Sequence, residues 1–374
     1  MRKTVVREVL DQFAPASAVL SLYSDTDRGR RTAKEIVIAL KNLNRDALRL
    51  VEDWSREDQE AMRDLLEKVF PRVEDLSKDL PRGWSFFVSP QSPPFTLPLP
   101  ASVAAEASLG PRPRLFPLIQ ALSPFRETLV VVVESKAILF FRRYGAELTL
   151  MTRRDVEFPP RIKAGGRYGM EERRIERHGD EETARLLREA AAEAKRLYGE
   201  GTFRRLLVFG ARELTQPLLE RLHEMLPTEE IDLLPESPEK GEGALQSLLD
   251  QWAQSRFWQE GEGLVVRILS EAPKGGPAAA GLRAVLAASN RGGVHQLVVE
   301  EYERRRGVRC PSCGSLGIDE ATCPLCGHET DEEPDLLEAL VQQVFEKDGE
   351  ALVLGRPSLL REWEGIGALL RFVP

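Results

Sequence analysis

The chain has 374 residues, of which 42% are hydrophobic and 30% are charged, as in a soluble globular protein. A chain of this length is expected to build more than one hydrophobic core. It has no apolar run of about 18 residues, which a transmembrane helix needs, and Arg7, Glu8 and Asp11 interrupt the apolar N-terminus, which argues against a signal peptide. These features exclude a membrane protein and predict a multi-domain protein of the cytoplasm.

Charge is segregated along the sequence. The formal net charge of -8 argues against nucleic-acid binding by the molecule as a whole, because a phosphate backbone attracts basic surfaces. Residues 153–177 nevertheless hold eight Lys/Arg against five Asp/Glu, so the remainder of the chain carries a net charge of -11. A locally basic segment can bind a polyanion even in an acidic protein. This segment is therefore the candidate for such a site.

Residues 1–113 predict an N-terminal α/β domain. Its expected elements are, in order, a strand at 18–23, helices at 32–51 and 55–76, and a strand at 84–88. In the first loop, Asp25 and Asp27 could form a metal-binding pair or an RNA-contacting tip, but a turn with a helix N-cap is the favoured interpretation. Eight prolines within residues 89–117 predict a semi-rigid, extended linker at the end of this domain.

Two further α/β domains are expected, a middle domain at 114–240 and a C-terminal domain at 241–374. In the middle domain we expect strands at 129–133, 137–142, 146–150, 204–210 and 230–234 and helices at 181–198 and 214–226. The β-branched run from Leu129 to Val133 is typical of a strand buried on both faces. In the C-terminal domain we expect helices at 244–258, 277–289, 335–346 and 358–363 and strands at 296–300, 351–354 and 368–372.

The basic segment contains a glycine pair directly ahead of a long amphipathic helix, in the sequence KAGGRYGMEERRIERH from Lys163 to His178. Glycines permit backbone conformations that other residues resist, and arginine presents a fork of donors suited to phosphate. Arg173 and Arg177 are four residues apart and share one helical face. From the residues alone, two interpretations stay open: an RNA-contacting tip, or a solvated helix start with ion pairs to neighbouring glutamates.

All four cysteines occur as two Cys-x-x-Cys pairs, Cys310 with Cys313 and Cys323 with Cys326. In a chain without a secretion signal, this spacing favours a metal over disulfides. Four thiolates delivered by two tight turns suit structural zinc, and the closed ligand set leaves no position for catalysis. A zinc ribbon at 308–328 is therefore predicted. A degenerate site without metal and redox chemistry are the alternatives, and His328 could compete as a ligand.

The sequence offers no clear catalyst. It has no phosphate loop of the GxxxxGK[ST] type, so the protein is not expected to hydrolyse nucleotide itself. His178, His223 and His295 have no recognisable nucleophile or carboxylate partner nearby in sequence, and a surface or packing role is favoured for each.

These motifs together resemble the class-1 translation release factors of archaea and eukaryotes, their relative Pelota and a divergent bacterial branch. AGGRYGMEERRIER is similar to the release-factor segment that carries Gly-Gly-Gln ahead of a basic helix. The cysteine ribbon inside the third domain and the closing GIGALLRF at 365–372 are also similar to that family. The resemblance implies α/β domains in a release-factor-like arrangement, with the first near the decoding centre, the middle one towards the peptidyl-transferase centre and the third against a translational GTPase.

One departure from the family changes the expected function. Arg167 stands where the family keeps the glutamine that helps to position water, and arginine cannot accept a hydrogen bond but binds phosphate well. Residues 1–113 also lack the family's stop-codon-reading motif. The resemblance therefore implies a non-hydrolytic hibernation factor that occupies idle ribosomes, and we do not expect an enzyme.

The expected partners are 23S and 16S rRNA at the ribosomal A site and a translational GTPase, EF-Tu in particular, bound by a monomer. The RNA-binding residues expected from the resemblance are Lys163, Gly165, Gly166, Arg167, Tyr168, Arg173, Arg174, Arg177 and His178. Two alternatives remain, a peptidyl-tRNA hydrolase that rescues stalled ribosomes and a zinc-ribbon RNA-binding protein that acts off the ribosome.

Overall fold

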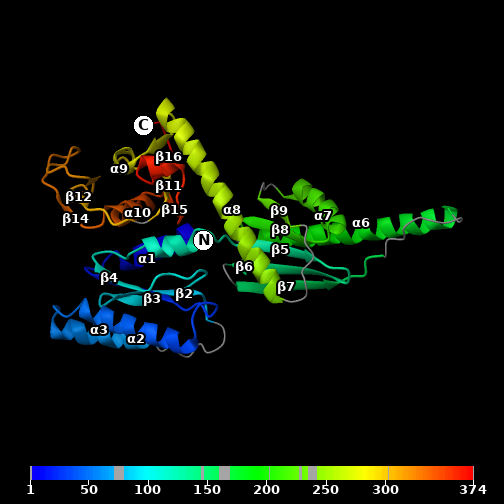
Figure 1. Ribbon diagram of the computed structural model, residues 1–374, viewed down its shortest axis with the longest axis horizontal. Helices are drawn as coiled ribbons and strands as arrows, with labels where there is room; N and C mark the ends of the chain where they lie inside the picture. Colours follow the sequence, from blue (N-terminus) through cyan, green and yellow to red (C-terminus); the bar gives the residue numbers. More distant parts are fainter. Residues whose placement is uncertain are drawn as a thin grey trace. The chain divides into compact units, whose positions relative to one another are not determined.

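The computed structural model describes residues 2–70, 80–144, 147–159, 169–201, 203–226, 230–234, 242–301 and 303–373, without the side chains of residues 2–3, 169–176 and 242–244. The chain forms two compact units. The first unit combines Met1–Phe125 with Trp252–Pro374, and the second is Arg126–Gln251 (Figure 1). The mixed α/β class is confirmed. The division into three domains stays a prediction, and its first and third ranges fall almost entirely within the first unit.

A helix-covered antiparallel sheet forms the N-terminal part of the first unit. Its elements are α1 (Arg2–Phe13), β1 (Val19–Asp25), α2 (Ala33–Arg49), α3 (Arg56–Val69), β2 (Gly83–Ser89), β3 (Ser92–Leu99) and β4 (Glu106–Gly110), with the strand order β3-β2-β1-β4. Helices α2 and α3 lie side by side on one face (Figure 1), where Leu40 and Leu66 pack against Phe86. Phe87 alternates to the opposite face and contacts Phe13 of α1. Helix α1 was not predicted from the sequence.

The predicted helix starts are confirmed by their caps. Thr32 and Glu35 form a reciprocal capping box at the start of α2, and Ser55 accepts a hydrogen bond from the Asp58 amide at the start of α3. In the loop before α2, Asp25 accepts from the Asp27 amide and pairs with Arg31 at 3.0 Å. The turn-and-cap interpretation of this loop is therefore confirmed, and it contains no metal-ligand group among the described residues.

The sequence predicted a linker in the proline-rich segment, and this prediction is wrong. The segment forms β3 and β4 and is followed by α5 (Phe116–Leu122). Prolines lack the N–H that an interior strand must donate, but β3 occupies an edge of its sheet, where that loss is tolerated. Proline density in this chain therefore marks a sheet edge.

The C-terminal part of the first unit holds a second sheet. Its elements are α8 (Glu242–Glu271, whose first residues belong to the second unit), η1 (Ala272–Lys274), β10 (Ala278–Ala280), α9 (Leu282–Asn290), β11 (Val294–Val299), β12 (Gly307–Arg309), β13 (Leu316–Gly317), β14 (Asp331–Glu333), α10 (Leu336–Glu346), β15 (Glu350–Val353), η2 (Leu359–Trp363) and β16 (Ile366–Leu370). The order is β10-β16-β11-β15, with β11 and β15 parallel. The single helix predicted at 277–289 is wrong in its first turn, because the alanine run pairs as β10 and α9 begins only after Gly281.

The second unit is a mixed sheet with helices on it. It contains β5 (Thr128–Val133), β6 (Ala137–Tyr144), β7 (Glu147–Asp155), α6 (Gly169–Glu200), β8 (Arg205–Gly210), α7 (Arg212–Met225) and β9 (Ile231–Leu234), in the order β7-β6-β5-β8-β9. Val131 and Val208 form the core with Leu187 of α6 and Leu222 of α7. Every residue of β5 is buried, which confirms the prediction of a strand buried on both faces.

A buried ion pair fixes β6 in the second unit. Arg143 is 2% exposed, and its guanidinium lies 2.6 Å from the carboxylate of Asp250. Its neighbour Arg142 reaches 2.6 Å to the carboxylate of Glu127, whose side chain is also buried. Burying a charge is unfavourable unless it is paired, so Asp250 stabilises the buried Arg143, and the half-exposed Arg142 stabilises the buried Glu127.

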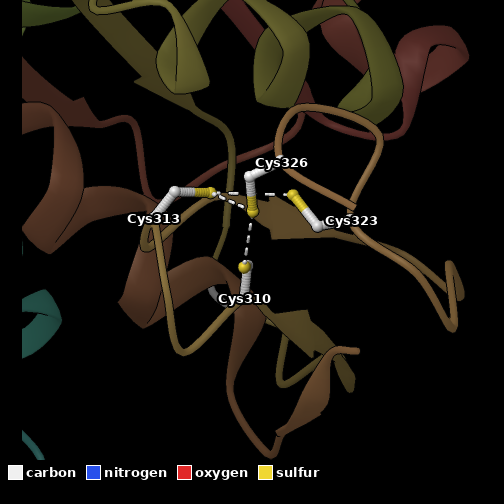
Figure 2. Close-up of side chains that lie close together, drawn as sticks. All are labelled: Cys310, Cys313, Cys323 and Cys326. Atoms are coloured by element: carbon white, nitrogen blue, oxygen red, sulfur yellow. Dashed lines mark hydrogen bonds between the residues drawn. The ribbon is translucent and has the colours of Figure 1, made fainter. Parts of the chain in front are cut away.

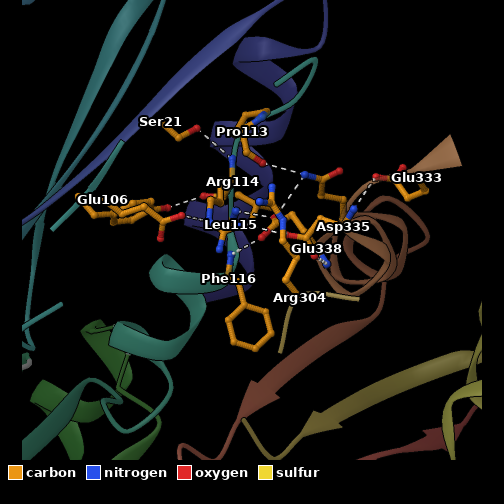
Figure 3. Close-up of polar contacts among 12 residues, drawn as sticks. Ser21, Glu106, Pro113, Arg114, Leu115, Phe116, Arg304, Glu333, Asp335 and Glu338 are labelled. Atoms are coloured by element: carbon orange, nitrogen blue, oxygen red, sulfur yellow. Dashed lines mark hydrogen bonds and ion pairs between the residues drawn. The ribbon is translucent and has the colours of Figure 1, made fainter. Parts of the chain in front are cut away.

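A second buried network joins the start of α5 to α10 within the first unit (Figure 3). The Glu338 carboxylate accepts hydrogen bonds from the backbone amides of Leu115 at 2.6 Å and Phe116 at 3.1 Å. Asp335 caps α10 and pairs with Arg114 at 2.9 Å. Burial raises the pKa of Glu338 to about 7, although the two amides and Arg114 act to lower it. This carboxyl therefore changes charge near neutral pH.

Candidate metal centre and nucleic-acid interface

The two Cys-x-x-Cys pairs adopt the same local geometry. The amide of Gly314 donates to the carbonyl of Cys310 at 2.9 Å, and the amide of Gly327 donates to the carbonyl of Cys323 at 2.9 Å. Each glycine has a left-handed backbone, with φ of 72° and 78°, which residues with a side chain rarely adopt. The repeated Cys-x-x-Cys-Gly sequence therefore makes two matching turns, each with two thiols.

The four sulfurs converge (Figure 2). They lie within 4.8 Å of one another, with Cys310 3.4 Å from Cys326, Cys313 3.6 Å from Cys323 and Cys326 3.5 Å from Cys313. A tetrahedral zinc with Zn–S bonds of about 2.3 Å would separate its sulfurs by about 3.8 Å. All four cysteines are free, and the observed separations are far longer than a disulfide bond.

Ser315 and the neighbouring thiols shift the pKa values of these cysteines. The Ser315 hydroxyl lies 3.1 Å from the Cys323 sulfur and lowers the pKa of that thiol to about 6. The backbone amide of Ser315 lowers the pKa of Cys313. The amide of His328 acts to lower the pKa of Cys326, but the neighbouring thiols, Cys310 first among them, raise it to about 12. Four thiolates at this spacing need a cation to offset their mutual repulsion.

Neighbouring helices fix the cysteine ribbon, residues 307–333. The side chain of Asn290, at the end of α9, exchanges two hydrogen bonds with the backbone of Leu316, at 2.8 and 2.9 Å. From α10, Gln343 donates to the carbonyl of Gly314 at 3.0 Å. Inside the ribbon the order is β13-β12-β14. Side chains of both helices thus hold the chain next to the Cys310–Cys313 turn.

The residues present fit a structural metal site. Cys310 and Cys323 are buried, Cys313 and Cys326 are exposed, and the donors are the soft thiolates that zinc accepts. Among the described residues, this is the one group of ligand side chains close enough to hold a metal ion, and His328 is not part of it. The spacing in the sequence pointed to all four cysteines that converge here. It gave no sign of Ser315, because a serine follows many cysteines without contacting them.

The predicted RNA-binding residues lie only partly within the described ranges. Lys163, Gly165, Gly166, Arg167 and Tyr168 lie outside them. Arg173 and Arg174 belong to α6, but their side chains are not described. Arg177 and His178 are exposed on α6. His223 and His295 are also exposed, as expected of surface residues.

Helix α6 contains the last residues of the basic segment, from Gly169 to Arg177. It has 32 residues, so it is about 48 Å long at 1.5 Å per residue. Its core contacts run from Leu186 to Leu197, and Figure 1 shows the helix continuing past the ends of the strands. Along the packed part, Arg185 pairs with Glu182 and Glu189, and Arg196 pairs with Glu193 and Glu200 in the same pattern. Much of the charge beyond the helix start is therefore locally balanced.

No helix in the described part of the chain is long and apolar enough to cross a membrane.

The middle of the chain is similar to a known family. A family model, bacterial archaeo-eukaryotic release factor family 10, matches residues 113–236. This range runs from α5 to β9 and includes the glycine pair and all of α6. The chain is thus similar over this third of its length to a release-factor-related bacterial family. Among curated proteins, no match was found.

Solved structures of translation factors are also similar to this chain. The archaeal translation termination factor aRF1 is 18% identical over 99% of this chain and 97% of its own, with a TM-score of 0.25. Dom34 of S. cerevisiae, a translation termination-like factor involved in RNA quality control, is 14% identical over 80% of this chain and 76% of its own, with a TM-score of 0.42. Ribosome-bound archaeal Pelota is 12% identical over 99% of this chain and 94% of its own, with a TM-score of 0.40. These likenesses assign none of those activities to this chain.

Proposed function

We propose that this protein is a ribosome-binding factor of the release-factor and Pelota type, and that it occupies idle ribosomes without cleaving peptidyl-tRNA, as a hibernation factor of the Balon type does. The observation that carries the proposal is the family match over residues 113–236, which includes the segment where Arg167 replaces the family's glutamine. Its sites would be the A-site regions of 23S and 16S rRNA, and its GTPase partner EF-Tu.

The geometry of α6 supports an RNA contact at its start. The helix is anchored through Leu187, Ala190 and Ala194, while its first turns carry Arg173, Arg174 and Arg177. A long helix that is packed at one end and carries three arginines at the other, beside three glutamates, suits a reach into a narrow, RNA-lined space. Arginine binds phosphate through paired donors, so an arginine-rich start favours RNA over an acidic protein surface.

The chemistry of Arg167 supports binding without hydrolysis. A guanidinium donates hydrogen bonds but accepts none, so it cannot orient an attacking water through an acceptor oxygen. Where a release factor needs that acceptor, this chain offers a phosphate-binding group. The cysteine site would hold zinc as a structural ion, through Cys310, Cys313, Cys323 and Cys326, and would stabilise the fold of the ribbon without taking part in a reaction.

Ribosome co-sedimentation tests the binding. We expect the full-length protein to sediment with ribosomes and to dissociate as salt rises. Replacing Arg173, Arg174 and Arg177 by Gln should weaken binding and reduce its salt dependence by about 0.7 to 0.9 in log–log slope per cation lost. A matched variant with Arg185, Arg188 and Lys195 replaced by Gln removes three charges from the same helix beyond its start and should bind as wild type. Equal binding by the two variants would contradict the assigned contact.

Peptide release tests the absence of hydrolysis. Ribosomes loaded with peptidyl-tRNA should release no peptide above background when the wild-type protein is added. Peptide release that survives Arg167→Ala but disappears when residues 163–168 are deleted would contradict the proposal that the protein is not an enzyme.

A peptidyl-tRNA hydrolase that rescues stalled ribosomes is the second candidate, favoured by the same match to a release-factor family. Arg167→Gln separates the two. A large gain of release in this variant over an inactive wild type supports the proposal, because it means that the segment reaches the ester but lacks the catalytic side chain. If the wild-type protein releases peptide and Arg167→Gln releases no more, the result supports the hydrolase. A protein that binds RNA but not ribosomes would instead act off the ribosome.

A further inference from the structure

One face of α2 carries a line of basic side chains, Lys34, Lys41, Arg45 and Arg49, called here the α2 basic face. Their spacing of seven, four and four residues places them within an arc of about 80° at 3.6 residues per turn. All four are exposed, Arg45 by 61% and Arg49 by 63%. At 1.5 Å per residue the line is about 22 Å long. The opposite side of the helix, with Ile36, Leu40, Leu43 and Ala47, packs into the core.

Few acidic groups offset this charge. Lys34 and Lys41 have no ion-pair partner within the described ranges. The α2 carboxylate of Glu35 is engaged in the capping box with Thr32. Asp46, on the flank of the face, lies 3.5 Å from Arg49 and 3.9 Å from Arg45, an exposed pairing that is worth little in water. The loop before the helix adds exposed Arg28 and Arg30 at its N-terminal end.

The neighbouring helix has the opposite charge. Residues 28–49 contain seven Lys/Arg and two Asp/Glu, whereas residues 52–68, which include most of α3, contain three Lys/Arg and seven Asp/Glu. Helices α2 and α3 lie side by side on the same sheet (Figure 1). Neither charge pattern is needed by the core, because both lie on the solvent side. A polyanion would therefore be attracted along α2 and repelled from α3.

We infer that the α2 basic face binds the phosphate backbone of RNA, as a contact separate from the glycine segment at 163–178. A phosphate backbone is a line of negative charges, which matches a line of cations along a helix axis. A membrane surface would require several exposed apolar side chains, and on this face Ile38 alone is exposed and apolar. The choice of RNA over an acidic protein rests on the proposed ribosome-binding function.

The test is binding of the full-length protein to a fluorescent oligouridylate over a salt series, measured by anisotropy. Replacing Lys34, Lys41 and Arg45 by Gln should make the slope of log K against log salt shallower by about 2, at about 0.7 per phosphate contact on a single strand. Over a fourfold range of salt this corresponds to an about 15-fold smaller loss of affinity. Replacing Arg56, Arg63 and Lys68 on α3 by Gln removes the same charge and should leave the slope unchanged.

A charge-retaining variant with Lys34→Arg, Lys41→Arg and Arg45→Lys should bind like wild type, and the circular dichroism of every variant should match wild type because all the positions are exposed. Equal slopes for the α2 and α3 variants would overturn the inference. The inference would also be overturned if the α2 variant bound RNA as strongly as wild type but lost binding to phosphatidylserine vesicles or to an acidic protein.

Ribosome co-sedimentation separates this inference from the proposed function. If wild type sediments with ribosomes while the α2 variant keeps its full RNA slope, the inference fails and the proposed function stands. If no variant sediments with ribosomes but the α2 substitutions still reduce the RNA slope, the proposed function fails and the inference stands.

Discussion

Glu338→Gln should change how the stability of the first unit depends on pH. The Glu338 side chain is buried between α10 and the start of α5, and burial raises its pKa from 4.5 to about 7. Arg114 acts against this shift and Asp335 adds to it. Because the folded carboxyl keeps its proton between pH 4.5 and about 7 while the unfolded one has lost it, folding takes up a proton in this window.

The sign and size of the effect follow from this difference. Stability from this group is fully present below pH 4.5 and is lost as pH rises through about 7. A shift of about 2.5 pKa units corresponds to about 3 kcal/mol, at 1.36 kcal/mol per unit. Glutamine is neutral at every pH, but its one oxygen replaces only one of the two acceptors, because Leu115 and Phe116 donate to different carboxylate oxygens. Glu338→Gln should therefore lose stability at every pH from the unpaired amide, but relative to wild type it should gain up to about 3 kcal/mol as pH rises from 4 to 8.

Urea unfolding followed by tryptophan fluorescence measures this directly. All five tryptophans, Trp54, Trp84, Trp252, Trp258 and Trp363, belong to the first unit, so the signal reports on that unit. Glu346→Gln is the matched control, since this exposed carboxylate on the same helix pairs with Arg112 at the surface. A pH slope in Glu338→Gln that equals that of wild type would refute the reasoning.

Three further outcomes are expected. Wild type should carry one zinc per chain by mass spectrometry. Cys323→Ser should lose the zinc and open residues 307–333 to hydrogen exchange, whereas the control Ser312→Ala should do neither. Retained zinc in Cys323→Ser would argue against ligation by four thiolates. A strong chelator should reproduce the Cys323→Ser exchange pattern in wild type, and an unaffected ribbon would mean that the metal is not structural. Arg143→Leu should destabilise the second unit by about 3 kcal/mol, seen as faster exchange in β5 and β6, because the mostly buried Asp250 carboxylate loses the guanidinium 2.6 Å away. Adding Asp250→Leu should recover part of the loss. Equal exchange in wild type and Arg143→Leu would count against the pair.

Elements with strong local signals were predictable from the sequence. Helices α2 and α3 were predictable because their N-cap residues, Thr32 and Ser55, precede residues with apolar periodicity. Both helices start where expected. The strand at 128–133 is β-branched at every position except Leu129, a composition that favours a buried strand over a helix. In each case, local preference and tertiary packing require the same structure.

The errors occur where tertiary pairing overrides local preference. Ala278–Ala280 has high helix propensity but forms β10 because β16 supplies a partner strand. Residues 92–99 contain three prolines and still form β3, because the edge of the sheet tolerates them. Helix α1 has no acidic residue in its first turn that would mark its start.

The candidate metal site was predictable because its ligands are close in sequence, with Cys310 and Cys326 only sixteen residues apart. The Glu338 network was not, since its partners Leu115 and Phe116 are 223 and 222 residues away. The α2 basic face lies between these cases. Its helical spacing is visible in the sequence, but its exposure becomes clear only once the buried side of α2 is known.

The prolines of β3 have a consequence for self-association. Pro93, Pro94 and Pro98 remove three N–H groups from the outer strand of the N-terminal sheet, and all three residues are exposed. A strand from another molecule that aligned with this edge would find gaps in the hydrogen-bond ladder it needs. The feature that made this segment look like a linker therefore makes it a poor template for edge-to-edge aggregation.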